Sequence, residues 1–461
     1  MAFLVSGTLR VAAQIADAQD SLGRKVVGGT AWPSSLPAPS RAPPRPTLAL
    51  PSQGKYSVQG PRVALTLSSP EVSASTVAIL ESVFQTLGFE RCQRREASVQ
   101  DFLEELTGFR EQLDAHGAPM GCVLVALVAP NGQLRQPQKL VRELSGCEAL
   151  RGCPKVFLLL SSAPGAAPKP GTFLTGLSEL CGRCPHWSLL QLLTEPEPSP
   201  SAQYDLSRDR AALFLAVIRD RPGAQRDVEA LEGLCQTLGF ETTLRTDPTA
   251  QAFQEELAQF QERLDTRRSP VSCALVALMA HGGPQGQLLG ADGKEVRPEA
   301  LVRELSHCRA LWGCPKIFLL QACRGGHRDA GMGPTALPWF WRWLRAPPVT
   351  PSHADVLRIY ADAQGNSSGG FMPGSCDQAD ILMVYAAAEG CVAYRDEKGS
   401  DFIQTLVEVL RATPEGDLLE LLTEVNRQVC ELDVRGPDCN ERRKACLEIR
   451  SSLRRRLCLQ A

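Results

Sequence analysis

The chain carries two copies of one long segment. The stretch "TLGFERCQRREASVQDFLEEL" at 86–106 matches "TLGFETTLRTDPTAQAFQEEL" at 237–257, and "LVRELSGCEALRGCPKVFLL" at 140–159 matches "LVRELSHCRALWGCPKIFLL" at 301–320. Two copies are too few for a solenoid, in which three or more units stack. The repeat therefore indicates a duplicated module, and we expect the sequence beyond residue 376 to have no counterpart in the first copy.

The second copy predicts helices that alternate with strands. "CALVALMA" at 273–280 and "KIFLL" at 316–320 are short continuous apolar runs, which are typical of strands buried on both faces. An apolar stripe with helical spacing precedes them, at Phe253, Leu257, Phe260 and Leu264. This alternation predicts an α/β fold, with an open, mostly parallel sheet flanked by helices.

Composition and charge limit the partners, the compartment and the cofactors that we expect. The formal net charge of −2 gives no reason to expect nucleic acid or a membrane surface as the main partner. The 17 cysteines are dispersed and several sit in apolar segments, so we expect free thiols and a cytoplasmic, or else nuclear, location. Cys181, Cys184 and His186 supply half a zinc site at most, so we predict no metal and no other cofactor.

One cysteine and one histidine occupy equivalent places. Cys323 and His281 each follow an apolar strand of the second copy, and ligands of parallel sheets bind beyond the carboxyl ends of strands. The cysteine lies in "QACRG" at 321–325, with the histidine upstream. That combination is a known signature of a cysteine nucleophile with a histidine partner.

With these motifs, and with "MAHGG" and "VAYRDEKGSDFIQTLV", the chain resembles the caspases, the aspartate-directed cysteine proteases. The resemblance implies a caspase-like sheet and is strongest to the epidermal, short-prodomain branch. It implies six segments: a disordered Pro/Ser-rich tail (1–60), a degenerate large-subunit-like module (61–165), a linker (166–203), the large subunit (204–330), an inter-subunit linker (331–376) and the small subunit (377–461).

The resemblance also implies roles for single residues. Cys323 is the nucleophile, His281 its acid–base partner, and the backbone N–H groups of Gly282 and Cys323 hold the oxyanion. The pocket for a P1 aspartate has three further residues, Arg221, Gln321 and Arg395, and Tyr394 lines the P2 pocket. Arg219 lies close enough to Arg221 to leave that alignment open. Two arginines suit a carboxylate, because a guanidinium binds it through two parallel hydrogen bonds.

The first copy lacks these groups. Ser162 stands where the second copy has Cys323, Leu160 where it has Gln321, and Pro130 where it has His281. His116 is no substitute, because it precedes a strand instead of following one. We therefore predict that the first copy is catalytically inactive.

Two functions remain open. The first is a cysteine endopeptidase that cleaves after Asp, is made as a zymogen, acts as a homodimer of large and small subunit pairs, and works in apoptosis or epithelial differentiation. Its processing sites are expected at Asp355 or Asp362. The alternative is a caspase-like interaction protein with weak catalysis that regulates other caspases.

Overall fold

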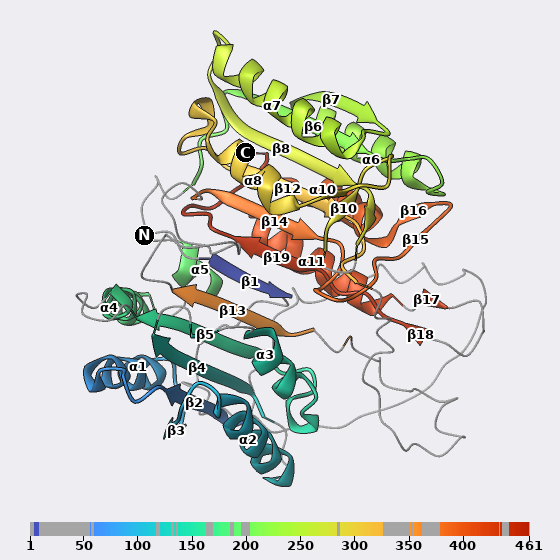
Figure 1. The fold of residues 1–461 in the computed structure, drawn as a ribbon. Coiled ribbons are helices and arrows are strands. Elements are labelled where there is room, and N and C mark those ends of the chain that lie inside the picture. The colour runs from blue at the N-terminus through green and yellow to red at the C-terminus, as the bar shows by residue number, and fades with distance from the viewer. Residues whose placement is uncertain are drawn as a thin grey trace, which may run out of the picture.

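The computed structural model of the chain describes residues 4–8, 56, 60–116, 120–130, 133–134, 137–162, 169–184, 189–194, 203–283, 286–325, 351, 354–361, 379–432, 434–435 and 442–460. Its framework is a 12-stranded sheet in the order β3-β2-β4-β5-β13-β1-β19-β14-β12-β8-β6-β7 (Figure 1). Most neighbouring strands are parallel and helices flank both faces. The predicted α/β fold is therefore confirmed.

The first part of the chain supplies one end of this sheet. Its elements are β1 (Leu4–Thr8), β2 (Arg62–Ser68), α1 (Ala74–Thr86), β3 (Arg91–Glu96), α2 (Phe102–His116), β4 (Cys122–Pro130), α3 (Pro137–Ser145), η1 (Glu148–Leu150), β5 (Lys155–Ser162), α4 (Lys169–Arg183) and α5 (Leu189–Thr194).

The rest of the chain begins with β6 (Asp209–Ala216), α6 (Ala224–Thr237), β7 (Phe240–Thr246), α7 (Ala250–Thr266), β8 (Val271–Met279), β9 (His281–Gly282), β10 (Leu288–Leu289), β11 (Glu295–Val296), α8 (Pro298–Ser306), η3 (Arg309–Leu311) and β12 (Lys316–Gln321). It continues with β13 (Val356–Ala361), β14 (Ile381–Tyr385), β15 (Arg395–Asp396), β16 (Gly399–Ser400), α10 (Asp401–Ala412), α11 (Leu418–Glu431), β17 (Val434–Arg435), β18 (Arg442–Arg443) and β19 (Glu448–Ser451). Among the helices that the structure describes, none combines the length and apolar character needed to cross a bilayer.

Local sequence explains the main elements. Every residue of β8 is buried, as its unbroken apolar run predicts. Helix α7 begins where the Thr249 hydroxyl accepts a hydrogen bond from the Ala252 N–H, which satisfies one of the free donors at a helix start. Its predicted stripe is buried, from Phe253 to Leu264. Such an apolar stripe fixes which face of the helix packs on the sheet.

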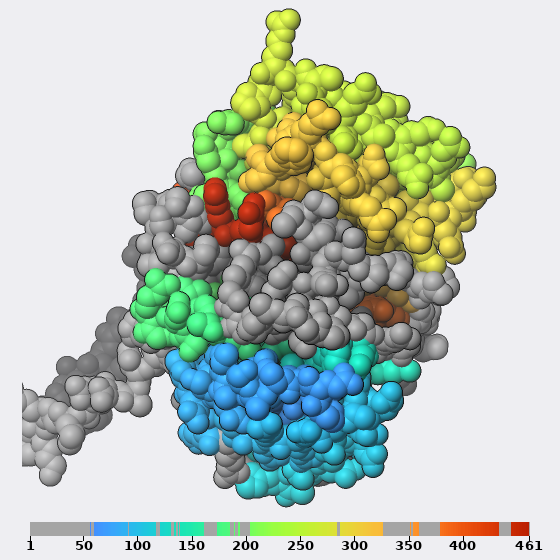
Figure 2. Space-filling view, turned by 60° about the vertical axis from the view of Figure 1, so that its left-hand side comes forward, coloured from blue at the N-terminus to red at the C-terminus, as the bar shows by residue number. Residues whose placement is uncertain are grey.

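Two layers of helices enclose the sheet. One face carries α1, α4, α5, α6, α10 and α11 over a single continuous apolar core. The other face carries two separate cores, one under α2 and α3 and the other under α7 and α8. We call β1 to α5 together with β13 the N-terminal half, and the remaining elements from β6 to β19 the C-terminal half. Figure 2 shows their outer elements at opposite ends of the molecule, the first in blue and the second in yellow and green.

Three segments expected to be tail or linker contain regular structure. The tail prediction for 1–60 is wrong at residues 4–8, where β1 lies in the middle of the sheet. The linker prediction for 166–203 is wrong for α4 and α5, whose residues Leu174, Leu177 and Leu193 are buried in the core. The linker prediction for 331–376 is wrong at β13, which pairs with β5 and β1.

These segments repeat parts of the C-terminal half, although we expected no counterpart for residues beyond 376. "LLQLLTE" at 189–195, which contains α5, matches "LLELLTE" at 418–424 of α11. "ADVLRIYADAQG" at 354–365 matches "ADILMVYAAAEG" at 379–390, so β13 corresponds to β14. The duplication therefore reaches into the region that resembles a small subunit.

Candidate active site

Strands β8 and β12 bring the predicted cysteine and histidine together. The strands are parallel neighbours, Met279 pairs with Gln321, and the Ala280 N–H donates to the Gln321 carbonyl at 3.2 Å. His281 and Cys323 follow directly and leave the same edge of the sheet. Residues at such an edge are well placed to meet a ligand.

A glycine is required at the contact between the two strand ends. A Cβ atom added to Gly282 would lie 1.7 Å from the carbonyl oxygen of Cys323, so no side chain fits there. The Cys323 Sγ, which is only partly buried, lies 3.7 Å from the carbonyl oxygen of Ala393. That carbonyl belongs to the loop after β14. The end of β12, strand β9 and this loop therefore meet near the thiol.

Arg221 lies under this edge and is almost completely buried. Its Nη1 donates to the Val217 carbonyl at 2.6 Å and its Nη2 donates to the Gln321 carbonyl at 3.3 Å. Its Nε and the Gln321 side-chain oxygen are buried with no hydrogen-bond partner in the described part of the chain. Buried polar atoms without partners are rare, and here they mark a place for a polar ligand.

Arg395 approaches from the other side, on β15. Its Nε donates to the Pro222 carbonyl at 2.7 Å, and Gly223, with φ of 76°, allows the β15 backbone to pass close by. Burial, and then the charge of Arg395, lower the pKa of Arg221 to about 10. Burial also lowers the pKa of Arg395. Two cations held together at this cost form a site for an anion.

Asp227 is a residue next to this site that the sequence analysis did not single out. It is 1% exposed on α6, and its Oδ1 accepts hydrogen bonds from the Ser400 N–H and the Gln404 amide. Its charge acts on both Arg221 and Arg395 and favours their protonated forms. A carboxylate on the apolar face of a helix, beside Val228, is the signal that would have found it.

His281 stands in the field of these arginines. Partial burial, and then the charges of Arg221 and Arg395, lower the pKa of His281 below its usual value, while Asp220 opposes the shift. This shift favours the neutral form of the imidazole. A neutral imidazole can accept a proton, which a general base must do.

The residue after the cysteine is fixed by a buried ion pair. Arg324 pairs with Glu448 of β19 and its guanidinium lies 4.0 Å from the ring centre of Tyr385. The Arg324 N–H and carbonyl also bond to Cys391 and Gly390, in the loop that leads to Arg395. Sequence reasoning missed Glu448, although a carboxylate inside the apolar run "CLEI" was a signal.

The other predicted residues lie as follows. Tyr394 is half-buried against the main core, next to Arg395. Asp355 is only 5% exposed, and its Oδ1 accepts the Tyr56 hydroxyl at 2.5 Å. That environment argues against Asp355 as a processing site in the folded chain. Asp362 lies outside the described residues.

The corresponding edge of the N-terminal half has a different character. Leu160 is fully buried, and Pro130 pairs with Ser162 within the strands β4 and β5. His116 ends α2. Among the described residues the structure shows no group of His, Cys, Asp and Glu that would hold a metal, and no disulfide links the cysteines of that part of the chain.

Comparison with known proteins identifies the family of the chain. The family model described as "Caspase domain" matches residues 210–458. Human caspase-14 is 40% identical over 271 residues, which cover 58% of this chain and 100% of that protein. The chain belongs to the caspase family.

Other relatives extend the comparison. Rat caspase-8 is 32% identical over 224 residues, which cover 48% of this chain and 42% of that protein. The crystal structure of caspase-1 from Spodoptera frugiperda has a TM-score of 0.44 and 23% identity, covering 57% of this chain and 98% of that chain. The predicted family, and its resemblance to the caspase-14 branch, are confirmed, so this is a protein of the caspase-like cysteine protease class.

Proposed function

We propose that the chain is a cysteine endopeptidase that cleaves peptide bonds after aspartate. One observation carries the proposal: the Arg221 Nε, which is buried without a partner in the described part of the chain, lies within the influence of Arg395 and of the Cys323 thiol. A substrate aspartate would supply an anion for the two arginines and a hydrogen-bond acceptor for the Arg221 Nε. Discrimination against an uncharged P1 residue should be steep, because it leaves buried donors unpaired.

The reaction uses groups already in place. The Cys323 thiol transfers its proton to His281, and the thiolate attacks the carbonyl carbon of the scissile bond. The backbone N–H groups of Gly282 and Cys323 stabilise the oxyanion that forms. His281 then protonates the leaving amine, and a water molecule, deprotonated by His281, hydrolyses the thioester.

The segment between residues 325 and 379 connects the two parts of the chain that supply the site. Arg395 lies beyond this connector, whereas Arg221, His281 and Cys323 lie before it, so the site combines residues from both sides of the connector. We propose a zymogen that is cut in the connector, with Asp362 the preferred site. We further propose that the substrates are proteins with Asp at P1, and that their cleavage belongs to apoptosis or epithelial differentiation.

The test uses purified protein that has been cut in the connector, with peptides that carry Asp, Asn or Glu at P1. We expect cleavage of the Asp peptide only, abolished by Cys323→Ala and by His281→Ala. Ser162→Ala, at the equivalent place in the N-terminal half, is the matched control and should retain full turnover. Equal loss of activity in Ser162→Ala and Cys323→Ala would contradict the assignment.

A second function is favoured by the N-terminal half, which keeps the framework without the nucleophile. In this alternative the chain binds and regulates other caspases with little turnover. An intact covalent adduct of Cys323 with an Asp-based electrophile, but no peptide cleavage, would support it over the protease.

A further inference from the structure

The 12-stranded sheet reads alike from both ends. From the outside inwards, β3-β2-β4-β5-β13-β1 in the N-terminal half has the same arrangement as β7-β6-β8-β12-β14-β19 in the C-terminal half. In each half the fourth and fifth strands are parallel, and the sixth is antiparallel to the fifth. The two sixth strands, β1 and β19, pair antiparallel at the centre.

The register obeys the same symmetry. Gly7 pairs with Leu357 as Ser451 pairs with Leu382, and Val5 pairs with Ile359 as Ile449 pairs with Val384. Across the centre, Val5 pairs with Ser451, Gly7 pairs with Ile449, and Ser6 faces Arg450. A two-fold axis between Ser6 and Arg450 therefore relates the halves.

Buried polar contacts repeat in both halves. The Tyr56 hydroxyl donates to Asp355 at 2.5 Å, and the Tyr204 hydroxyl donates to Asp380 at 2.6 Å. Asp355 and Asp380 have φ of 64° and 65°. The backbone carbonyl of each accepts a hydrogen bond, at 2.8 Å, from the N–H of the lysine that begins the neighbouring strand of the sheet. Those lysines are Lys155 and Lys316. Contacts reproduced at this level indicate two subunits of one design within one chain.

The two halves also touch next to the active site. The Arg142 guanidinium of α3 lies 3.5 Å from the Glu389 carbonyl, in the loop that carries Arg395. On the sheet, Arg358 of β13 acts on Glu448, whose carboxylate holds Arg324 beside the nucleophile. Burial opposes ionisation of Glu448, but the charges of Arg324, Arg450 and Arg358 hold its pKa well below the usual range. Met383 occupies the place of Arg358 in the C-terminal half, so this charge is specific to the N-terminal half.

We infer that the N-terminal half is a built-in partner subunit, which occupies the β19 edge of the C-terminal half in place of a second copy of the chain. Strand β1 already pairs with that edge, so a homodimer through residues 377–461 could not use it. An exposed strand edge invites pairing with another chain, and a covered one does not. The chain therefore works as a monomer with one active site. Its N-terminal half supports Arg324 and the Arg395 loop. That this support serves catalysis rests on the proposed function.

Oligomeric state tests the inference without any reference to activity. Sedimentation of the uncut wild-type chain over a hundredfold range of concentration should give one species of 49.9 kDa. A species of twice that mass, growing with concentration, would overturn the inference even if the protein were a fully active protease.

A β1 variant provides the second arm. Ser6→Pro removes a backbone donor from the middle of the central strand, which should open the β19 edge. We expect concentration-dependent dimers of Ser6→Pro, whereas Ser6→Thr, the matched control, stays monomeric. A monomeric Ser6→Pro with unchanged peptide turnover would contradict the inference.

A third experiment tests whether the N-terminal half affects catalysis. Arg358→Met places the C-terminal half's residue at the equivalent position and should lower kcat about fivefold with little change in KM, while Arg358→Lys restores most of it. Arg95→Met removes an arginine of the same half on β3, the outermost strand, and should leave kcat unchanged. Equal kcat in Arg358→Met and the wild type would remove the positioning role. Absence of Asp-directed turnover in the wild type would instead refute the proposed function and leave the sedimentation result to stand by itself.

Discussion

At the scale of single residues, the pocket works by holding like charges together. Arg221 and Arg395 repel each other, and Asp227, locked by Ser400 and Gln404, offsets that repulsion from behind. The sequence singled out Cys323, His281 and the two arginines, because each lies in a short local motif. It did not reveal Asp227 or Glu448, because a carboxylate gains its role only from the charges that tertiary structure brings to it.

Arg395→Lys should not be a conservative change. A lysine presents one compact charge, so the two parallel hydrogen bonds to a P1 carboxylate are lost. We expect a loss of about 2 kcal/mol in transition-state binding, or roughly 30-fold in kcat/KM. Steady-state kinetics on an Asp peptide measures it, with the exposed Arg219→Lys as the control. Equal losses in both variants would place Arg395 outside the pocket.

The charge of Arg395 should also be visible in the titration of His281. That charge lowers the pKa of His281, so Arg395→Met should raise it, and the imidazole would then be protonated at a higher pH. The acid limb of the kcat/KM profile should move to higher pH with it. NMR titration of the imidazole in a Cys323→Ala background measures the same shift without catalysis, and Arg219→Met should not change it.

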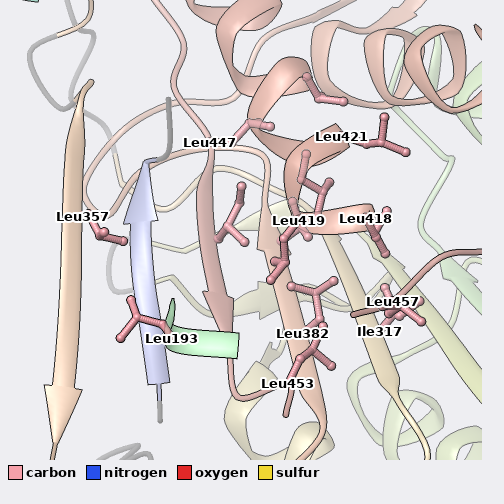
Figure 3. Close-up of a cluster of buried hydrophobic side chains, with 14 of the residues drawn as sticks. Leu193, Ile317, Leu357, Leu382, Leu418, Leu419, Leu421, Leu447, Leu453 and Leu457 are labelled. Carbon is pink, nitrogen blue, oxygen red and sulfur yellow. The ribbon is translucent and has the colours of Figure 1, made fainter. Parts of the chain in front are cut away.

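At the scale of elements, three short pieces complete the N-terminal half: β1, β13 and the pair α4–α5. Figure 3 shows Leu193 of α5 and Leu357 of β13 beside β1, with Leu447 on its other side. The sequence analysis missed these pieces because they lie in segments whose composition indicated tail or linker. The matches "LLQLLTE" and "ADVLRIYADAQG" were nevertheless present. Strand β1 has no such signal, because its place depends on pairing with β13 and β19.

Asp355 tests whether β13 has a structural role. Asp355→Ala removes the buried acceptor of the Tyr56 hydroxyl and places alanine at a positive φ, so unfolding free energy should fall by about 2 kcal/mol. Asp355→Asn keeps an acceptor and tolerates that φ, so it should remain close to wild type in a urea titration. If both variants instead lose a cleavage product at unchanged stability, the position is a processing site.

At the scale of the whole molecule, one apolar core crosses the boundary between the halves. It runs from Leu80 and Phe84 of α1, through Leu357 and Ile449, to Val228 of α6. Neither family motifs nor hydrophobic periodicity could predict this continuity, since it depends on how β1 and β19 pair. The halves are therefore expected to unfold as one unit.

Urea unfolding followed by amide hydrogen exchange checks this cooperativity. Amides of α1 and α6 should lose protection with the same free energy and the same dependence on denaturant, because neither helix can lose its share of the core alone. Protection lost in α1 several kcal/mol before α6 would show that the halves are independent. The exposed helix end near Thr237 serves as an internal reference for local fraying.

The position of β13 in the chain has a consequence for synthesis. Strand β13 belongs to the N-terminal half but is synthesised only after β12. The other inner strand of that half, β1, pairs with β13 and with β19 near the end of the chain. On the ribosome, β5 therefore waits with an unpaired edge while nearly two hundred further residues emerge. Loop closure over such separations is slow, so the nascent chain should depend on chaperones until its final strand is released.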